Sequence, residues 1–248
     1  MRGKIIEHLR YLYQRQMERE LKNQFDGRFV AMFHQVDDNP AEWYDNQYAI
    51  SFEVFVKFVN KLQKAGYEIV PPYDIVKKDG KNKAVLSFDD VFEGVYKCVY
   101  PFLRENNLPF VIFPTISKLK EKGYINKEML IEMSTNYEGC YVGGHGITHC
   151  NLRNISKEEC QKEIIQSKGI LEEIIGSKVE LFAYPYGDLN AVGRRERSIA
   201  GENFKMAFGT LQTGVTDRSK SNYIPRININ DNFQDLEFIK WCILRKVL

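Results

Sequence analysis

The sequence predicts an α/β protein built as a closed or nearly closed barrel. Helix and strand signals alternate from residue 28 onward, which is the order expected of a parallel sheet with helices outside it. About seven such units in about 220 residues fit a β/α barrel better than an open sheet. We expect one domain over residues 29–248, preceded by a helical extension over residues 1–28.

The first elements follow from apolar spacing and from cap residues. Residues 4–24 carry an amphipathic helical pattern, which favours a packing helix and leaves peripheral membrane contact as an alternative. The apolar run RFVAMFH, residues 28–34, predicts a buried strand that ends at His34. The segment 51–66 predicts a helix that begins at a Ser51 cap.

The later elements continue the alternation. Ser156 and Glu159 form a capping box that opens a helix, and Gly176 closes that helix. Strands are expected over residues 67–72, 83–88, 108–115, 179–187, 205–210 and 222–229, with a strand end and glycine-rich loop at 141–149. Further helices are expected over residues 95–107, 126–136 and 191–203.

Composition and charge narrow the class of protein. A net charge of +2 without a dense Lys/Arg block gives no reason to expect a nucleic-acid partner. No stretch approaches the roughly 20 apolar residues of a membrane span, and the first residues have no apolar core of secretory type. The five cysteines lack a tight disulfide framework, which favours a reducing compartment. We therefore expect a cytoplasmic protein.

Chemically active side chains collect at predicted strand ends. Asp89 and Asp90 end one strand, His145 and His149 follow another, and His34 ends the first. In a β/α barrel such positions form the functional face. Two histidines and one carboxylate can hold zinc or another divalent ion. The ion would acidify a bound water, and the second carboxylate could then act as base toward that water.

Each feature also has a structural alternative. The Asp pair could be a helix N-cap with a solvated neighbour. The two histidines could be satisfied or exposed side chains, or could form a structural zinc site with Cys140 and Cys150. His34 could simply be packed in the core.

Three motifs in order resemble one family. LSFDD, GGHGITH and FAYPYG, at residues 86–90, 143–149 and 182–187, resemble the polysaccharide deacetylases, the NodB-homology group or carbohydrate esterase family 4. The resemblance implies a distorted (β/α)7-type barrel that holds a divalent metal, with zinc as the expected ion. The implied activity is a metal-dependent hydrolase that removes an N-acetyl group from an amino sugar and releases acetate.

The resemblance also implies roles for individual residues. The metal ligands would be Asp90, His145 and His149, and Asp89 would be the general base. The backbone N–H of Tyr186 would help to form the oxyanion hole, and Tyr184 and Tyr186 would wall the acetyl pocket. Tyr184, Pro185 and Arg226 are the candidate substrate-binding residues.

This sequence departs from the family pattern in three places. Val91 stands where glycine usually follows the Asp pair, and Ala183 stands where an arginine usually orients the base. Arg226 is a candidate to replace that arginine. The late histidine that acts as general acid is absent near the C-terminus. His34 is the candidate replacement, because the poly-N-acetylglucosamine deacetylase branch looks circularly rearranged, with an N-terminal strand that carries this histidine.

Two other functions stay open at this point. The changed third motif and the missing late histidine favour a non-catalytic sugar-binding protein on a degenerate deacetylase fold. A metal-dependent amidohydrolase that acts on a non-sugar substrate is the other alternative. If the chain is a cytoplasmic deacetylase, its substrate would be an N-acetylated sugar in a glycan precursor.

Overall fold

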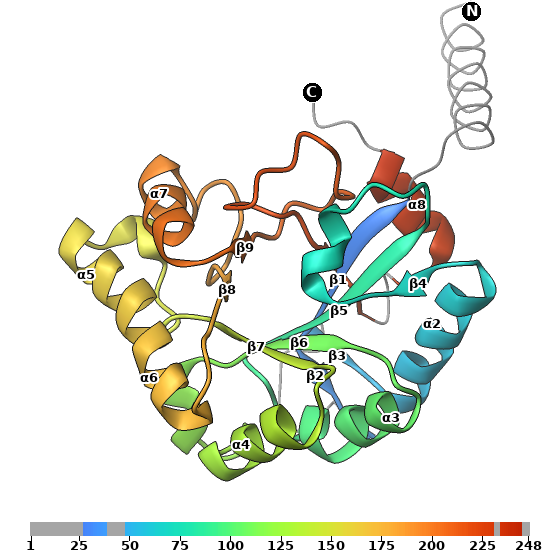
Figure 1. Cartoon of the computed structure of the whole chain (residues 1–248), viewed down its shortest axis with the longest axis horizontal. Coiled ribbons are helices and arrows are strands. Elements are labelled where there is room, and N and C mark those ends of the chain that lie inside the picture. The colour runs from blue at the N-terminus through green and yellow to red at the C-terminus, as the bar shows by residue number, and fades with distance from the viewer. Residues whose placement is uncertain (1–26, 39–47, 231–233, 245–248) are drawn as a thin grey trace, which may run out of the picture.

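A computed structural model describes residues 27–38, 48–230 and 234–244 of the chain. In Figure 1 a strongly curled sheet lies at the centre and helices surround it on the outer side. This is the α/β barrel that the sequence predicts. The predicted N-terminal extension lies outside the described residues except for its last two, and so does the helix expected over residues 4–24.

Parallel strands form the main sheet in the order β10-β1-β5-β6-β7-β8-β9. Their bounds are β1 Arg28–Phe33, β5 Lys83–Asp89, β6 Phe110–Phe113, β7 Cys140–Gly144, β8 Leu181–Ala183, β9 Met206–Phe208 and β10 Ile227–Asn228. A parallel bridge between Phe208 and Ile224 joins β9 to the segment just before β10. Because β10 also pairs with β1, the strands run around a ring.

Two smaller pairings complete the strands. β4, Glu68–Ile69, pairs with the first residues of β5. β2, Gln35–Val36, pairs with β3, Ala49–Ile50, in a separate two-stranded sheet that the sequence pattern does not predict. These strands are too short to show a clear period of two.

Three helix ends lie at the signals that the sequence predicts. The bounds of the helices are α2 Phe52–Lys64, α3 Tyr100–Glu105, α4 Lys127–Asn136, α5 Lys157–Gln161, α6 Ser167–Ile175, α7 Arg194–Asn203 and α8 Leu236–Leu244. Ser51 caps α2 by accepting a hydrogen bond from the N–H of Val54, and the Ser156–Glu159 capping box opens α5. Gly176 ends α6 with a left-handed φ of 68°, which glycine adopts without steric cost.

Two expected helices are interrupted. A π-helical turn, η4 at Val95–Val99, precedes α3, and a second, η7 at Lys162–Gln166, separates α5 from α6. Such turns often occur near functional sites, where they re-aim a side chain. Helix α8 has no counterpart among the predicted elements.

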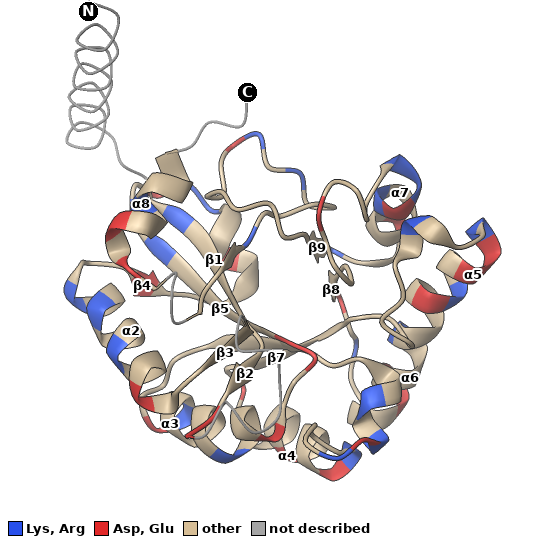
Figure 2. Cartoon of the chain, turned by 180° about the vertical axis from the view of Figure 1, so that it is seen from behind, with Lys and Arg blue, Asp and Glu red and all other residues tan. Residues whose placement is uncertain are grey.

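The core lies between the sheet and the outer helices. Every residue of β1 and β5 is buried, and Phe33 of β1 stacks on Phe88 of β5 with ring centroids 5.3 Å apart. Phe55 and Phe58 of α2 cover this pair edge-on. Each buried Phe contributes about 1.5–3 kcal/mol. Most charged residues lie on the outer helices and loops, as Figure 2 shows.

The carboxyl ends of the strands carry unusual backbone conformations. Asp90, Val91, His149 and Tyr186 have left-handed φ angles of 59°, 51°, 60° and 63°. Non-glycine residues adopt this region at a cost, and they do so most often at functional sites. No described helix has the length and apolar character that a membrane span needs.

Candidate active site and metal centre

A cavity of about 370 Å³ opens at the carboxyl ends of the strands. Side chains from β1, β5 and the loops after β7, β8 and β9 meet in it. The lining residues are Met32, His34, Tyr48, Asp89, Asp90, His145, His149, Tyr186, Asp188, Thr210, Gln212 and Asn228. Six residues that the sequence singles out for chemistry therefore share one cavity.

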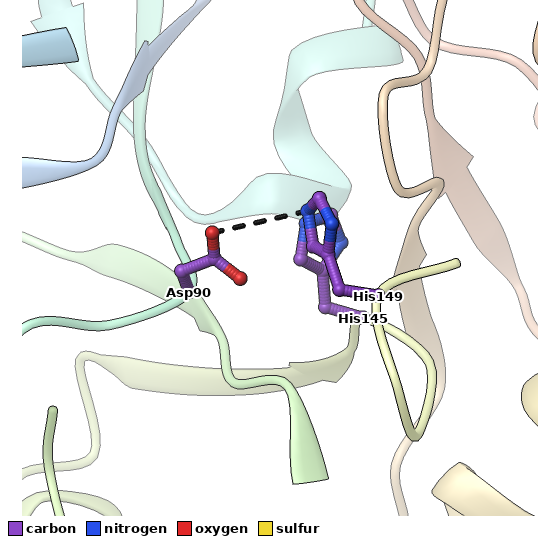
Figure 3. Close-up of side chains that lie close together, drawn as sticks. All are labelled: Asp90, His145 and His149. Atoms are coloured by element: carbon purple, nitrogen blue, oxygen red, sulfur yellow. Dashed lines mark ion pairs between the residues drawn. The ribbon is translucent and has the colours of Figure 1, made fainter. Parts of the chain in front are cut away.

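Asp90, His145 and His149 form a compact donor set. One ligand atom from each lies within 4.8 Å of the others, and the Asp90 Oδ2 to His149 Nε2 distance is 3.8 Å (Figure 3). Donor atoms around a tetrahedral zinc ion lie about 3.4 Å apart. A small inward adjustment of the side chains would therefore suit a divalent ion.

The hydrogen bond of His145 prepares its ring for a cation. Nδ1 lies 2.8 Å from the carbonyl oxygen of Ala183 on β8. Because a carbonyl only accepts, Nδ1 must carry the proton and Nε2 keeps its lone pair. Burial lowers the pKa of His145 to about 4, so the imidazole is neutral near pH 7.

Asp90 has protein donors on both oxygens. The Thr115 hydroxyl donates to Oδ1 at 2.8 Å, and Lys118 Nζ lies 2.8 Å from Oδ2. Burial raises the pKa of Asp90, but His145, His149 and Lys118 outweigh that effect and hold it below its usual range. Asp90 is therefore a carboxylate at neutral pH. No motif or apolar spacing in the sequence indicates a role for Thr115 or Lys118 in the site.

Asp89 is paired with Arg226. Nη1 and Nη2 of the guanidinium lie 2.6 and 2.7 Å from the two Asp89 oxygens, and Nε donates to the carbonyl of Gly209 at 3.0 Å. Burial raises the pKa of Asp89, but Arg226 and then His145 lower it more, so the group stays ionised. Asp89 Oδ2 also lies 3.9 Å from His145 Nε2, next to the donor set.

His34 lines the same cavity from the end of β1. Its ring packs against Tyr48 with centroids 4.8 Å apart, and its buried Nδ1 has no hydrogen-bond partner among the described residues. Burial lowers the pKa of His34, while the carboxylates of Asp89 and Asp90 act in the opposite direction. A buried polar atom without a partner calls for an explanation, and one explanation is a role in the site.

The third motif divides its residues between the cavity and the core. Tyr186 is 57% exposed, its ring lies 5.1 Å from that of His149, and within the described residues its N–H donates no hydrogen bond. Tyr184 is buried instead and donates its hydroxyl to the carbonyl of Asn222, and Pro185 is buried next to Gly146. Among the described residues, neither Tyr184 nor Pro185 lines the cavity.

Glu163 is a site residue that the sequence analysis missed. From the π-helical turn η7 its carboxylate accepts hydrogen bonds from the N–H groups of Ile147 and Thr148, at 2.7 and 3.0 Å, and from the Thr148 hydroxyl at 2.8 Å. These donors lie in the loop between His145 and His149. Glu163 therefore fixes the loop that presents both imidazoles, although it is no part of the motifs.

The sequence profile of the polysaccharide deacetylase family matches residues 76–201, which is half of the chain. This chain therefore belongs to the polysaccharide deacetylase family. The match contains the segments that carry Asp89, Asp90, His145, His149 and Tyr186. The predicted family, and with it the class of carbohydrate deacetylases, is confirmed.

Individual relatives agree with this assignment. The poly-β-1,6-N-acetyl-D-glucosamine N-deacetylase of Staphylococcus aureus is 26% identical over 206 residues, covering 77% of this chain and 70% of its own. IcaB from Ammonifex degensii superposes with a TM-score of 0.75 at 21% identity, over 88% of this chain and 98% of its own. The deacetylase PplD of Streptococcus pyogenes, solved with acetate, has a TM-score of 0.74 at 18% identity, over 87% and 97% of the two chains. The structural likenesses establish the fold.

Proposed function

We propose that this chain is a hydrolase that removes an N-acetyl group from an amino sugar with the help of a divalent metal ion, and that zinc is the preferred ion. The observation that carries the proposal is the placement of Asp89 beside the Asp90, His145 and His149 donor set in one cavity. A sugar-binding protein would have no need of a buried, ionised carboxylate at this point.

The donor set fits the proposed ion. Two imidazoles and one carboxylate form a common site for zinc with open positions for substrate and water. When bound, a divalent ion supplies two effects, the acidification of a water and the polarisation of the acetyl carbonyl. Asp90, His145 and His149 would hold it.

Asp89 is the proposed general base. The Arg226 guanidinium keeps it ionised and fixes the plane of its carboxylate, so it is ready to accept a proton from the attacking water. Arg226 is fully buried. This supports a role in orienting Asp89, as the motif arginine of the family would do, rather than a contact with the substrate.

His34 and Tyr186 complete the proposed site. An amine leaves an amide readily only when its nitrogen is protonated, and the imidazole of His34, which lines the cavity, could supply that proton. Its lowered pKa makes the protonated imidazole a stronger donor. The N–H of Tyr186 is available to the oxygen on which negative charge develops.

The substrate and its compartment are proposed from weaker signals. The name of the Staphylococcus aureus relative specifies a polymer of N-acetylglucosamine, which supports an N-acetylated glycan or glycan precursor as substrate. Among the described residues, Cys98, Cys140, Cys150 and Cys160 form no disulfide, which supports the expectation of a cytoplasmic location.

The test is acetate release from N-acetylglucosamine oligomers by the purified chain. We expect turnover that a chelator abolishes and that added zinc restores. Asp89→Asn should lower kcat by about 10²- to 10⁴-fold, the usual contribution of a general base, while zinc binding stays close to that of the wild type. Zinc binding without any acetate release would favour the degenerate sugar-binding alternative. Turnover of simple N-acetyl amides alone would favour a non-sugar amidohydrolase.

A further inference from the structure

Lys118 is a cationic side chain that forms an ion pair with the proposed metal ligand Asp90. It lies in the short helix η5, Ile116–Lys120, after β6, and its side chain is only 17% exposed. Its Nζ lies 2.8 Å from Asp90 Oδ2 and 4.8 Å from the centre of the Tyr124 ring. Among the described residues, Lys118 forms its ion pair with Asp90 alone.

The oxygen that Lys118 contacts is the one that faces the histidines. Asp90 Oδ2 lies 3.8 Å from His149 Nε2, whereas Oδ1 already accepts the hydrogen bond of Thr115. A metal ion held by Asp90 and His149 through these atoms would therefore share Oδ2 with an ammonium group. Lys118 is not among the described residues that line the cavity.

Two physical consequences follow for a bound cation. The ammonium repels a divalent ion only a few ångströms away, and this repulsion is weakly screened in a buried site. The hydrogen bond also withdraws charge from Oδ2, which makes Asp90 a weaker donor. Both effects lower the affinity of the site for metal and leave more positive charge on the ion that is bound.

We propose that Lys118 sets the metal affinity of this site by competing with the cation for Asp90 Oδ2. The inference rests on the proposed metal-dependent function and goes beyond it, because it assigns a residue outside the family motifs. In the metal-free protein Lys118 neutralises the buried carboxylate of Asp90, and in the loaded protein it keeps the ion weakly held.

Zinc affinity, measured by calorimetry or by competition with a chromogenic chelator, tests this proposal without substrate. Lys118→Met should bind zinc at least about tenfold more tightly than the wild type, because it removes the charge and the hydrogen bond. Lys118→Gln can retain a hydrogen bond without the charge, and should also bind more tightly. Lys120→Met, on the exposed side of the same helix, is the matched control and should leave the affinity unchanged.

The possible results separate this inference from the proposed function. Unchanged or weaker zinc binding by both Lys118 variants, in a wild type that binds zinc and releases acetate, would overturn the role of Lys118 only. A wild type and variants that bind no zinc at all would overturn both proposals. Thermal melting of each variant identifies the folded ones, and either folded Lys118 variant is sufficient for the test.

Discussion

Strands β1 and β5 each begin with a buried cation and end at a chemically active residue, so their two ends can be compared directly. Arg28 and Lys83 start the strands, while His34 and Asp89 stand at their carboxyl ends. Arg28, Lys83 and Asp89 are buried and His34 is partly buried, yet only the residues at the carboxyl end line the cavity described above. The comparison shows what distinguishes a structural buried charge from a functional one.

At the amino end, fixed protein groups satisfy the cations. Lys83 donates to the carbonyls of Asp74 and Lys77 and pairs with Asp79, and Arg28 donates to the carbonyl of Val76 and pairs with Asp217. These contacts join the start of each strand to neighbouring loops, so we assign them a structural role.

At the carboxyl end, the chemically active residues line a cavity. The Asp89 carboxylate pairs with Arg226 and lies next to the His145 ring, and the buried Nδ1 of His34 has no hydrogen-bond partner in the described part of the chain. Burial alone therefore does not mark a functional residue. An unsatisfied group or a shared donor set that faces a cavity does.

The largest effect is expected from breaking the carboxyl-end pair with Arg226→Met. The variant leaves the Asp89 carboxylate buried without its cationic partner. We expect kcat to fall by about 10²-fold because the base is misplaced. We expect the free energy of unfolding to fall by about 3–5 kcal/mol because the buried charge is uncompensated. Without Arg226 the pKa of Asp89 rises, so the acidic limb of the kcat/KM profile should move to higher pH. A pH–rate profile and a denaturant titration provide the measurements.

Arg226→Lys is the matched variant for this prediction, because it keeps the charge but loses the two-pronged contact with Asp89. It should lie between the wild type and Arg226→Met in both kcat and pH profile. An Arg226→Met enzyme whose acidic limb stays in place would show that Arg226 has only a structural role.

A smaller effect is expected one step away from the cavity, at Glu163. Glu163→Gln loses one acceptor for the loop between His145 and His149, so zinc affinity should fall about tenfold, as for other outer partners of metal ligands. Calorimetric titration with zinc measures this. Glu158→Gln, on the exposed face of α5, should leave the affinity at the wild-type value. If Glu163→Gln and Glu158→Gln bound zinc with equal affinity, Glu163 would have no role in metal binding.

The smallest effect on activity is expected at the amino end. Lys83→Met should lower the free energy of unfolding by about 1–2 kcal/mol, because two carbonyls lose a donor. It should leave kcat within about twofold of the wild type. Lys81→Met, which breaks an exposed pair with Glu68, should change stability by less than about 1 kcal/mol. A large loss of kcat in Lys83→Met would contradict the division between the two ends.

The parts of the fold that the sequence predicts are those with local causes. The Ser51 cap, the Ser156–Glu159 box and Gly176 act within a few residues, and the structure confirms each of them. The π-helical turn η7 contains Glu163, whose hydrogen bonds to Ile147 and Thr148 are tertiary contacts that apolar spacing does not reveal. A periodic pattern therefore predicts one continuous helix where the structure has three segments.

The residues of the candidate site also divide into those that the sequence predicts and those that it does not. The residues of the motifs stand at strand ends, so topology alone brings Asp90, His145 and His149 together. Thr115 and Lys118 reach Asp90 from 25 and 28 residues away along the chain, and no periodicity or spacing reveals such contacts.

The left-handed turn after β5 has a consequence for how this protein can diverge. Asp90 must keep its side chain, whereas Val91 supplies only core packing and already holds the backbone angle that glycine takes most easily. Position 91 can thus exchange apolar burial for relief of backbone strain without removing any reactive group. Substitutions at position 91 would change the stability of the folded protein and leave the reactive groups at the carboxyl ends of the strands in place.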